Sequence, residues 1–322
     1  MRLFKKTVFW VLMLAVLGGL FYLIDRKSEE KKAATEIQKR LFAFSPSDIM
    51  GFTITKKGAQ PVSVKREGEV WLVTSPVNAP GDAKEVDEYL DKLVSAKLDG
   101  VLFEKAPEEK FKEMGLFDPD LSVELIPASG ESRTIVFGDT GPTHNISFAA
   151  IKNEPRIIRI NTDIKTDADK AAYDMRDKTI LAFEPTRIRK LDIKWTDGNR
   201  VVVEQTSEGK WNTLGLPDGR TDFLRLMEVL VKFKKTGIKA FIDEDPLDLG
   251  LYGLKTPRVR LLFVDEKGVK HSTYIGGRDK ERRGYYAVNG EAKNVFLLEE
   301  DIVDSIPRSI GDLEEKNEGT KG

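Results

Sequence analysis

The chain of 322 residues contains no cysteine and only two histidines, His144 and His271. The lack of cysteine excludes disulfides, thiolate catalysis, cysteine-ligated zinc and a lipid-modified N-terminal cysteine. Both histidines fall near expected strand edges or loops, and they occupy different positions of the internal repeat described below. We therefore interpret them as surface histidines without a catalytic role.

The sequence also lacks an excess of charge of either sign. Its 52 Lys and Arg residues nearly balance 53 Asp and Glu residues, which gives a formal net charge of −1. A nucleic-acid-binding protein needs a broad basic face. We therefore expect no nucleic-acid partner.

Motifs that carry chemistry are missing as well. The sequence has no glycine-rich phosphate loop, zinc-protease helix or Gly-x-Ser-x-Gly elbow. Carboxylates cluster at Asp118/Asp120, at Asp167/Asp169 and along 243–245, but without the spacing of a calcium loop. We predict no catalytic, cofactor-binding or metal-ligating residue and a protein that is not an enzyme. An unrecognised hydrolase is the alternative.

The longest apolar run lies at the N-terminus, where an uncharged segment extends from Val8 to Ile24. Such a helix is about 26 Å long, against a hydrocarbon core of roughly 30 Å. We predict a basic tail at 1–6 and a transmembrane signal-anchor at 7–24. The alternative is a cleaved signal peptide, but charged residues, rather than the small residues that cleavage requires, follow the run.

The orientation in the membrane follows less directly. Three Lys or Arg residues precede the span and four follow it closely, so the positive-inside rule is nearly balanced. The short basic head is typical of a signal-anchor. We expect a single pass through the inner (cytoplasmic) membrane with the soluble part periplasmic or otherwise extracytoplasmic.

A charged segment at 25–43 separates this span from the rest of the chain. It contains no Gly or Pro before Pro46, and pairs such as Lys32/Glu36 place opposite charges four residues apart. We predict a charged helical stalk. The alternative is a flexible juxtamembrane linker.

The second half of the chain repeats the first at an offset of 138 to 140 residues. Met114–Pro119, for example, returns as Tyr252–Pro257. A repeat of this length fixes the number of modules before any local prediction is made. We divide the rest of the chain into a first α+β module at 44–182, a second α+β module at 183–310 and a disordered tail at 311–322.

The periodicity of each module predicts the same elements in the same order. Alternating residues near 52–64 and 191–203 indicate a hairpin. A helix follows, with Asp82 as N-cap in the first module and a start at Thr221 or Asp222 in the second, where Phe223, Leu226, Met227, Leu230 and Phe233 form the apolar face. Four alternating segments then predict an antiparallel β-meander in each module, and the residues 163–178 predict a helix that links the modules. The fold class is thus α+β, with tandem duplicated modules behind one N-terminal transmembrane helix.

Residues that occur in both copies are better interpreted as structural than as catalytic. Trp71 and Trp211 follow equivalent Glu-Gly turns, and we predict that they are paired core anchors. Two Gly-Leu-x-x-Pro signals, with Gly115 and Pro119 in the first module and Gly253 and Pro257 in the second, are interpreted as turn-forming devices.

The strongest local difference between the copies is a basic loop in the second module. It carries Arg278, Lys280, Arg282 and Arg283, which have no basic counterparts in the first module. These cations suit contact with phosphate, acidic glycan or lipid headgroups. Since Asp279 and Glu281 alternate with them, an ordinary solvated loop is the alternative.

A set of short segments resembles the domain-of-unknown-function family numbered 4340. The segments are Met175–Lys178, Phe183–Pro185, Glu208–Trp211, Tyr252–Pro257, Tyr274–Gly276 and Tyr285–Val288. Their order and spacing carry the resemblance, which covers about 44–306. It implies one N-terminal membrane anchor and an ABC-2 type permease or its auxiliary subunit as partner. It supplies no catalytic residue.

We therefore expect a non-enzymatic, membrane-anchored accessory protein of an ABC-type export or envelope system that presents a partner-binding surface. The alternative is an envelope module that binds glycan or anionic lipid through the basic loop or the groove between the modules. The sequence does not specify the oligomeric state.

Overall fold

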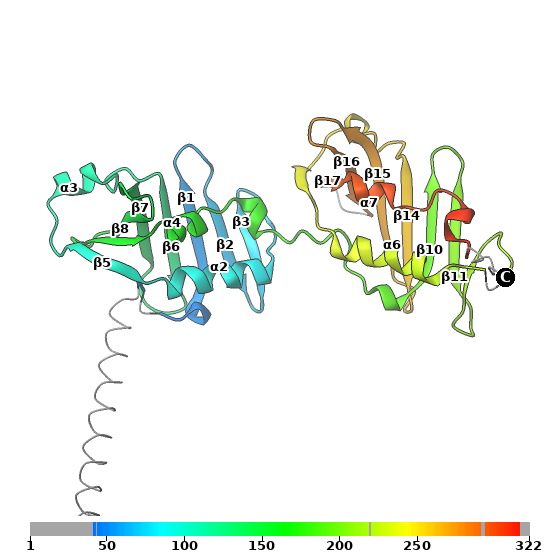
Figure 1. The fold of residues 1–322 in the computed structure, drawn as a ribbon, viewed down its shortest axis with the longest axis horizontal. Coiled ribbons are helices and arrows are strands. Elements are labelled where there is room, and N and C mark those ends of the chain that lie inside the picture. The colour runs from blue at the N-terminus through cyan, green and yellow to red at the C-terminus, as the bar shows by residue number, and fades with distance from the viewer. Residues whose placement is uncertain (1–40, 43, 219, 291–293, 316–322) are drawn as a thin grey trace, which may run out of the picture. The chain divides into compact units, whose positions relative to one another are not determined.

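The computed structural model describes residues 41, 42, 44–218, 220–290 and 294–315. The chain divides into two compact units, Met1–Arg176 and Asp177–Gly322, each built around its own sheet (Figure 1). The predicted basic tail at 1–6, the span at 7–24 and most of the stalk lie outside the described residues. Within the described ranges, no helix combines the length and the apolar character needed to cross a membrane.

The first unit contains a nine-stranded antiparallel sheet in the order β4-β3-β2-β1-β6-β7-β8-β9-β5. One helix, α2 (Ala83–Ser95), lies across this sheet, and three shorter helices α3 (Glu108–Glu113), α4 (Thr162–Ala168) and α5 (Ala172–Met175) accompany it. The strands are β1 (Ile49–Lys56), β2 (Val62–Glu67), β3 (Val70–Ser75), β4 (Ala79–Pro80), β5 (Leu98–Phe103), β6 (Leu121–Pro127), β7 (Arg133–Thr140), β8 (Ile146–Ile151) and β9 (Ile157–Asn161).

The second unit has an eight-stranded antiparallel sheet in the order β12-β11-β10-β14-β15-β16-β17-β13. Its long helix is α6 (Phe223–Lys235), and α7 (Glu300–Asp304) follows the last strand (Figure 1). The strands are β10 (Ile188–Trp195), β11 (Arg200–Gln205), β12 (Trp211–Thr213), β13 (Ala240–Asp243), β14 (Val259–Asp265), β15 (Lys270–Asp279), β16 (Gly284–Asn289) and β17 (Val295–Glu299).

The duplication is therefore present in the fold, and the strand registers match. Phe52 of β1 pairs with Val64 and Leu125, while Leu191 of β10 pairs with Val203 and Phe263. Apart from β4, the two sheets have the same strand order. The predicted hairpin, helix and meander are confirmed in both modules.

Each sheet buries one face beneath its long helix because successive strand residues point to opposite faces. On β7, Ile135 and Phe137 belong to the main core with α2, whereas Val136 belongs to a smaller cluster on the other face. The second unit repeats this arrangement, with Ile275 beneath α6 and Tyr274 on the opposite face. Each module thus has a large helix-covered core and a smaller opposite-face cluster.

The long helices begin at side-chain caps, as their sequences predict. Asp82 Oδ1 accepts hydrogen bonds from the backbone N–H groups of Lys84 and Glu85 at 3.1 and 3.2 Å. Asp222 accepts from the N–H of Arg225 at 2.9 Å. The predicted apolar face of α6 needs one correction: Phe223 at its first turn is 49% exposed, because the helix enters the core only from Leu226 onward.

Two further predictions are wrong. Residues 163–178 do not form one linking helix, because the chain leaves helical geometry at Asp169 and re-enters it at Ala172. Both α4 and α5 pack against α2 within the first unit, and they bury Ala168 and Met175 there. The prediction also omitted the strand that follows each long helix. These strands are β5 and β13, and they form the sheet edges beside β9 and β17.

The predicted module boundaries shift as well. Leu41 and Phe42, assigned to the stalk, are buried in the first core. Ile180 and Leu181, assigned to the first module, belong to the second core. Leu313, assigned to the tail, is fully buried in the second core, so the predicted tail is wrong for 311–315, and 316–322 lie outside the described residues.

Candidate functional site

The predicted basic loop lies at the tip of the hairpin formed by β15 and β16. Arg278 and Asp279 end β15, and Gly284 begins β16 opposite Asp279. Arg283 closes the turn with a φ of 51°, a left-handed backbone conformation that side chains rarely adopt. The hairpin therefore holds its basic residues in a tight turn between two paired strands.

Two of the four predicted cations are engaged by carboxylates of the same module. The Arg278 Nε donates to Glu300 Oε1 at 2.7 Å, and Arg278 lowers the pKa of the Glu300 carboxyl. The Arg282 guanidinium lies 3.5 Å from Asp279 Oδ2. The backbone N–H of Arg282, at 2.9 Å from Asp279 Oδ1, is the main cause of the lowered pKa of Asp279. These pairs reduce the positive charge that the loop offers to an anion.

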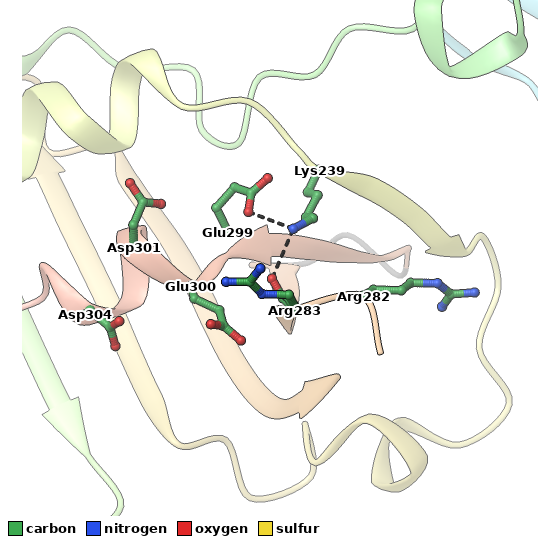
Figure 2. A pocket seen from close by; sticks show the side chains of 7 residues that line it. All are labelled: Lys239, Arg282, Arg283, Glu299, Glu300, Asp301 and Asp304. Atoms are coloured by element: carbon green, nitrogen blue, oxygen red, sulfur yellow. Dashed lines mark hydrogen bonds and ion pairs between the residues drawn. The ribbon is translucent and has the colours of Figure 1, made fainter. Parts of the chain in front are cut away.

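An open pocket of about 620 Å³ lies beside this hairpin, and charged side chains line it. Lys239 donates to the Glu299 carboxylate at 2.7 Å and to the backbone carbonyl of Arg283 at 3.0 Å (Figure 2). Figure 2 also shows Arg282 pointing away from the carboxylates of Glu299, Glu300, Asp301 and Asp304. The lining residues are Lys239, Arg282, Arg283, Glu299, Glu300, Asp301 and Asp304. With four carboxylates facing three cations, the pocket is not a cationic receptor.

Lys280 and the Arg283 guanidinium differ from the other two predicted cations, since neither forms an ion pair among the described residues. Contact with an anion or a partner stays a prediction for all four residues. The ion pairs of Arg278 and Arg282 leave Lys280 and Arg283 as the main support for this prediction. Within the same described part of the chain, no group of three or more acidic or histidine side chains is arranged to hold a metal ion.

The opposite-face cluster of the second module contains a pair of tyrosine–aspartate hydrogen bonds. Tyr252 donates to Asp243 Oδ2 at 2.7 Å, and Tyr286 donates to Asp279 Oδ2 at 2.8 Å. The two rings meet edge to face with centroids 5.2 Å apart. The hydrogen bond to Asp243 is the first cause of the raised pKa of Tyr252, whereas burial is the first cause for Tyr286. The first bond lies within the loop that follows β13 and the second within the basic hairpin, and the contact between the two rings connects the hairpin to the loop.

The first module builds the same cluster from apolar side chains. Phe103, Phe111, Met114 and Phe148 pack there around Leu116. Strand register shows that Phe103, opposite Ile157, is replaced by Asp243, opposite Val295. Met114 is likewise replaced by Tyr252. The first copy therefore shows that the fold does not need this polar pair.

The predicted turn devices occupy equivalent positions. Gly115 and Gly253 both have a φ of 67°, which favours glycine. Each turn then packs on a glycine of the sheet: a Cβ on Gly138 would lie 2.1 Å from the Met114 carbonyl oxygen, and one on Gly276 would lie 2.3 Å from that of Tyr252. Pro119 and Pro257 stand two residues before β6 and β14, and Pro257 is buried.

The predicted tryptophan anchors are equivalent in register but unequal in burial. Trp71 pairs with Arg66 and is 2% exposed, and its Nε1 donates to Asp87 at 2.9 Å. Trp211 pairs with Gln205, and it is half-buried against the second core. The two residues thus have a packing role, which is stronger in the first module.

Sequence reasoning missed a group of exposed apolar side chains in the second module. Leu247 is 103% exposed and Leu251 is 78% exposed, on the loop that contains Tyr252. Their counterparts in the first module, at an offset of 138, are Glu109 and Glu113. Backbone hydrogen bonds confirm this offset from Phe111 and Leu249 onward, because Leu116 N donates to Phe111 O as Leu254 N donates to Leu249 O. The signal was available in the repeat, as a change from Glu to Leu at two positions.

A second exposed group lies at the start of α6. Leu214, Phe223 and Leu224 are 73%, 49% and 74% exposed, where the first module has Thr74, Ala83 and Lys84. The first module also exposes apolar residues, but its most exposed ring, Phe117, lies beneath the Lys112 ammonium at 4.8 Å. The second module therefore has two exposed apolar groups where the first module has other residues, one on the loop with Leu247 and Leu251 and one at the start of α6.

Comparison with known proteins gives one family. The family model DUF4340, described as a domain of unknown function, matches residues 71–234 and again residues 220–318. The two matches overlap at α6, and together they cover most of the chain. Neither a curated protein nor a solved structure matches the sequence.

Proposed function

From the premise that the chain belongs to the DUF4340 family, we propose that it is a non-enzymatic, membrane-anchored accessory protein of an ABC-type export or envelope system. In this proposal, residues 7–24 anchor the chain in the inner membrane, and the duplicated modules present a partner-binding surface outside the cytoplasm. The partner is an ABC-2 type permease or its auxiliary subunit.

One observation carries the partner-binding part of the proposal. The second module exposes Leu247 and Leu251 where the first module, which has the same sheet order and the same glycine turn, has Glu109 and Glu113. The exposure of large apolar side chains to water costs free energy. Such side chains are typical of surfaces that another molecule covers. Since the first module folds without them, folding does not account for their presence.

Co-purification tests the choice of partner. The full chain is co-expressed with an ABC-2 type permease and its auxiliary subunit from the same organism, solubilised in a mild detergent and purified through a tag on the chain. We expect the permease or its auxiliary subunit to elute in a constant ratio to the chain. Repeated recovery of the chain alone, under conditions that keep the permease folded, would contradict the proposal.

The lack of native cysteine allows a direct test of location. The variant Ser207→Cys places one thiol on the exposed turn between β11 and β12. A maleimide that does not cross the inner membrane should label this variant in cells whose outer barrier has been opened, while the parent chain stays unlabelled. Labelling only after lysis would place the soluble part in the cytoplasm and overturn this part of the proposal.

The alternative function, an envelope module that binds glycan or anionic lipid, receives less support from the geometry. Arg278 pairs with Glu300 and Arg282 pairs with Asp279. Lys280 and Arg283 are the cations that the alternative can still use. Vesicles with and without anionic lipid distinguish the two functions: binding that requires anionic lipid and is lost in Lys280→Glu/Arg283→Glu would favour the alternative.

A further inference from the structure

The loop at 243–255 combines its two exposed leucines with a strong local negative charge. It contains Asp243, Glu244, Asp245 and Asp248 against Lys255, a net charge of −3. The corresponding loop of the first module, residues 103–117, has four Glu and three Lys residues, a net charge of −1. Apolar character and negative charge therefore increase together at the same place in the second module.

The backbone of this loop is fixed by its own hydrogen bonds. Asp248 Oδ1 accepts from the N–H of Gly250 at 2.7 Å and pairs with Lys255 at 2.9 Å. The bond from Tyr252 to Asp243 closes the other side of the loop. A rigid loop loses little conformational entropy when its side chains are buried by a partner.

This rigidity also decides which side chains face outward. Leu249 and Tyr252 pack into the opposite-face cluster around Leu254, so they hold the loop against the sheet. Leu247 and Leu251 alternate with them and point away from the module, as their exposures of 103% and 78% show. Leu249 and Tyr252 thus occupy the inward positions of the loop.

We infer that Leu247 and Leu251 insert into an apolar pocket of a partner protein whose rim carries Lys or Arg. Charge complementarity selects this occupant, because the net charge of −3 on the loop that carries the two leucines attracts a basic rim and steers its approach. An anionic bilayer surface is disfavoured, since it repels the same carboxylates. The inference rests on the proposed function only for the idea that a partner exists.

A second copy of the chain is the remaining candidate, but its basic hairpin would be a poor binding site. That hairpin carries Lys280 and Arg283, whose positive charges would complement the negative charge of the loop. The pocket beside that hairpin, however, is lined by seven charged side chains and gives a leucine no apolar seat. We therefore infer that the partner is a different polypeptide.

Photocrosslinking in the native membrane tests the inference. A benzophenone amino acid replaces Leu247 in the full chain, and matched probes at Glu109 and Leu214 report on the first module and on the second apolar group. We expect the probe at 247 to crosslink to another polypeptide at a segment that contains apolar residues together with Lys or Arg. The probe at 109 should give no such product.

Two variants connect the crosslink to its proposed causes. Leu251→Glu copies the residue of the first module, and it should reduce the yield from position 247 at least about tenfold, because it removes half of the inserted apolar surface and would bury a charge in the apolar pocket. The pair Glu244→Gln/Asp245→Asn removes two charges, and it should flatten the loss of yield between low and high salt. Since these side chains lie on an exposed loop, thermal unfolding should change little.

The outcomes separate the inference from the proposed function. A crosslink between two copies, a crosslink to lipid, an acidic target segment or a yield unchanged by Leu251→Glu would each overturn the inference. A partner crosslink from position 214 but not from 247 would overturn the inference and leave the proposed function standing. No crosslink from either position, together with failed co-purification, would overturn both.

Discussion

The close contact between the sheet glycine and the preceding turn gives the sharpest test of the fold. In Gly276→Ala, the new Cβ would lie 2.3 Å from the carbonyl oxygen of Tyr252 and 3.0 Å from the carbonyl carbon and oxygen of Gly253. These are backbone atoms, so no side-chain rotation relieves the clash. The turn or β15 must move by about 1 Å to restore a normal contact.

The expected cost follows from this forced movement. Overpacking of a buried site typically destabilises a protein by about 1–3 kcal/mol. For a module of this size, that corresponds to a decrease of about 4–12 °C in the melting temperature. The turn also positions Tyr252, so we expect its hydrogen bond to Asp243 to weaken in the same variant.

Gly311→Ala is the matched control, because Gly311 is exposed and the nearest atom to its added Cβ is the Ser309 hydroxyl oxygen at 3.7 Å. Urea unfolding should show a change within about 0.5 kcal/mol for this control. Hydrogen exchange followed by mass spectrometry assigns the effect to a module: Gly276→Ala should speed exchange in β14–β17 and leave β6–β9 unchanged. If the two variants unfold alike, the packing argument is wrong.

Three further changes test the core, a helix cap and the titrating groups. Phe263→Ala removes a fully buried ring that stacks on Phe183 at 5.1 Å, and it should cost about 3–5 kcal/mol in urea unfolding; a loss below 1 kcal/mol would refute its place in the core. Asp222→Ala should cost about 0.5–2 kcal/mol, whereas Asp222→Asn, which keeps an acceptor for the N–H of Arg225, should cost less. Burial raises the pKa of Tyr89. The protonated Tyr89 side chain therefore stabilises the fold fully below the ordinary tyrosine pKa, and this stabilisation decreases as the pH rises above about 10. Tyr89→Phe should make the free energy of unfolding less dependent on pH in that range, and an unchanged alkaline slope would contradict the assignment to Tyr89.

The helix and the meander were predictable because their periodicities are local. Val86, Tyr89, Leu90, Leu93 and Val94 recur at helical spacing, and all five are buried on α2. The strands of each meander alternate with a period of two and are joined by short loops, so neighbouring strands in the sequence pair in space. Where the signal is local and repeated, the sequence was sufficient.

The edge strands β5 and β13 were not predictable, because their pairing is not local in the sequence. β5 pairs with β9 across more than fifty residues, and its sequence contains Asp99 and Gly100, which are unfavourable in strands. Its register shifts twice along its length, so no regular alternation marks it. The prediction of one linking helix was wrong for a related reason. Ala168 and Met175 both reach the first core only because the chain turns between α4 and α5.

The charge state of the basic loop also depends on contacts that the sequence does not display. Glu300 reaches Arg278 from the first turn of α7, after the whole of β16 and β17. Glu299 reaches Lys239, which precedes β13 at the far edge of the sheet. A count of four cations in one loop therefore overestimated the positive charge that a ligand would meet.

Several differences between the modules fall on one loop, and their clustering is an argument about function. The device that holds the loop is the same in both copies, since Gly115 and Gly253 have equal φ angles and each turn packs on a sheet glycine. Around this unchanged frame, the second module replaces Phe103 and Met114 by the hydrogen-bonded pair Asp243 and Tyr252. The same loop replaces two exposed glutamates by leucines.

A requirement of the fold cannot explain these replacements, because the first module forms the same sheet order and the same turn without them. Random drift explains scattered changes better than it explains exposed leucines and added carboxylates within one hydrogen-bonded loop. Exposed leucines oppose solubility, while a rigid backbone that presents them favours association. The partner that we propose would account for both features if it binds at Leu247 and Leu251 rather than at the paired cations of the neighbouring hairpin.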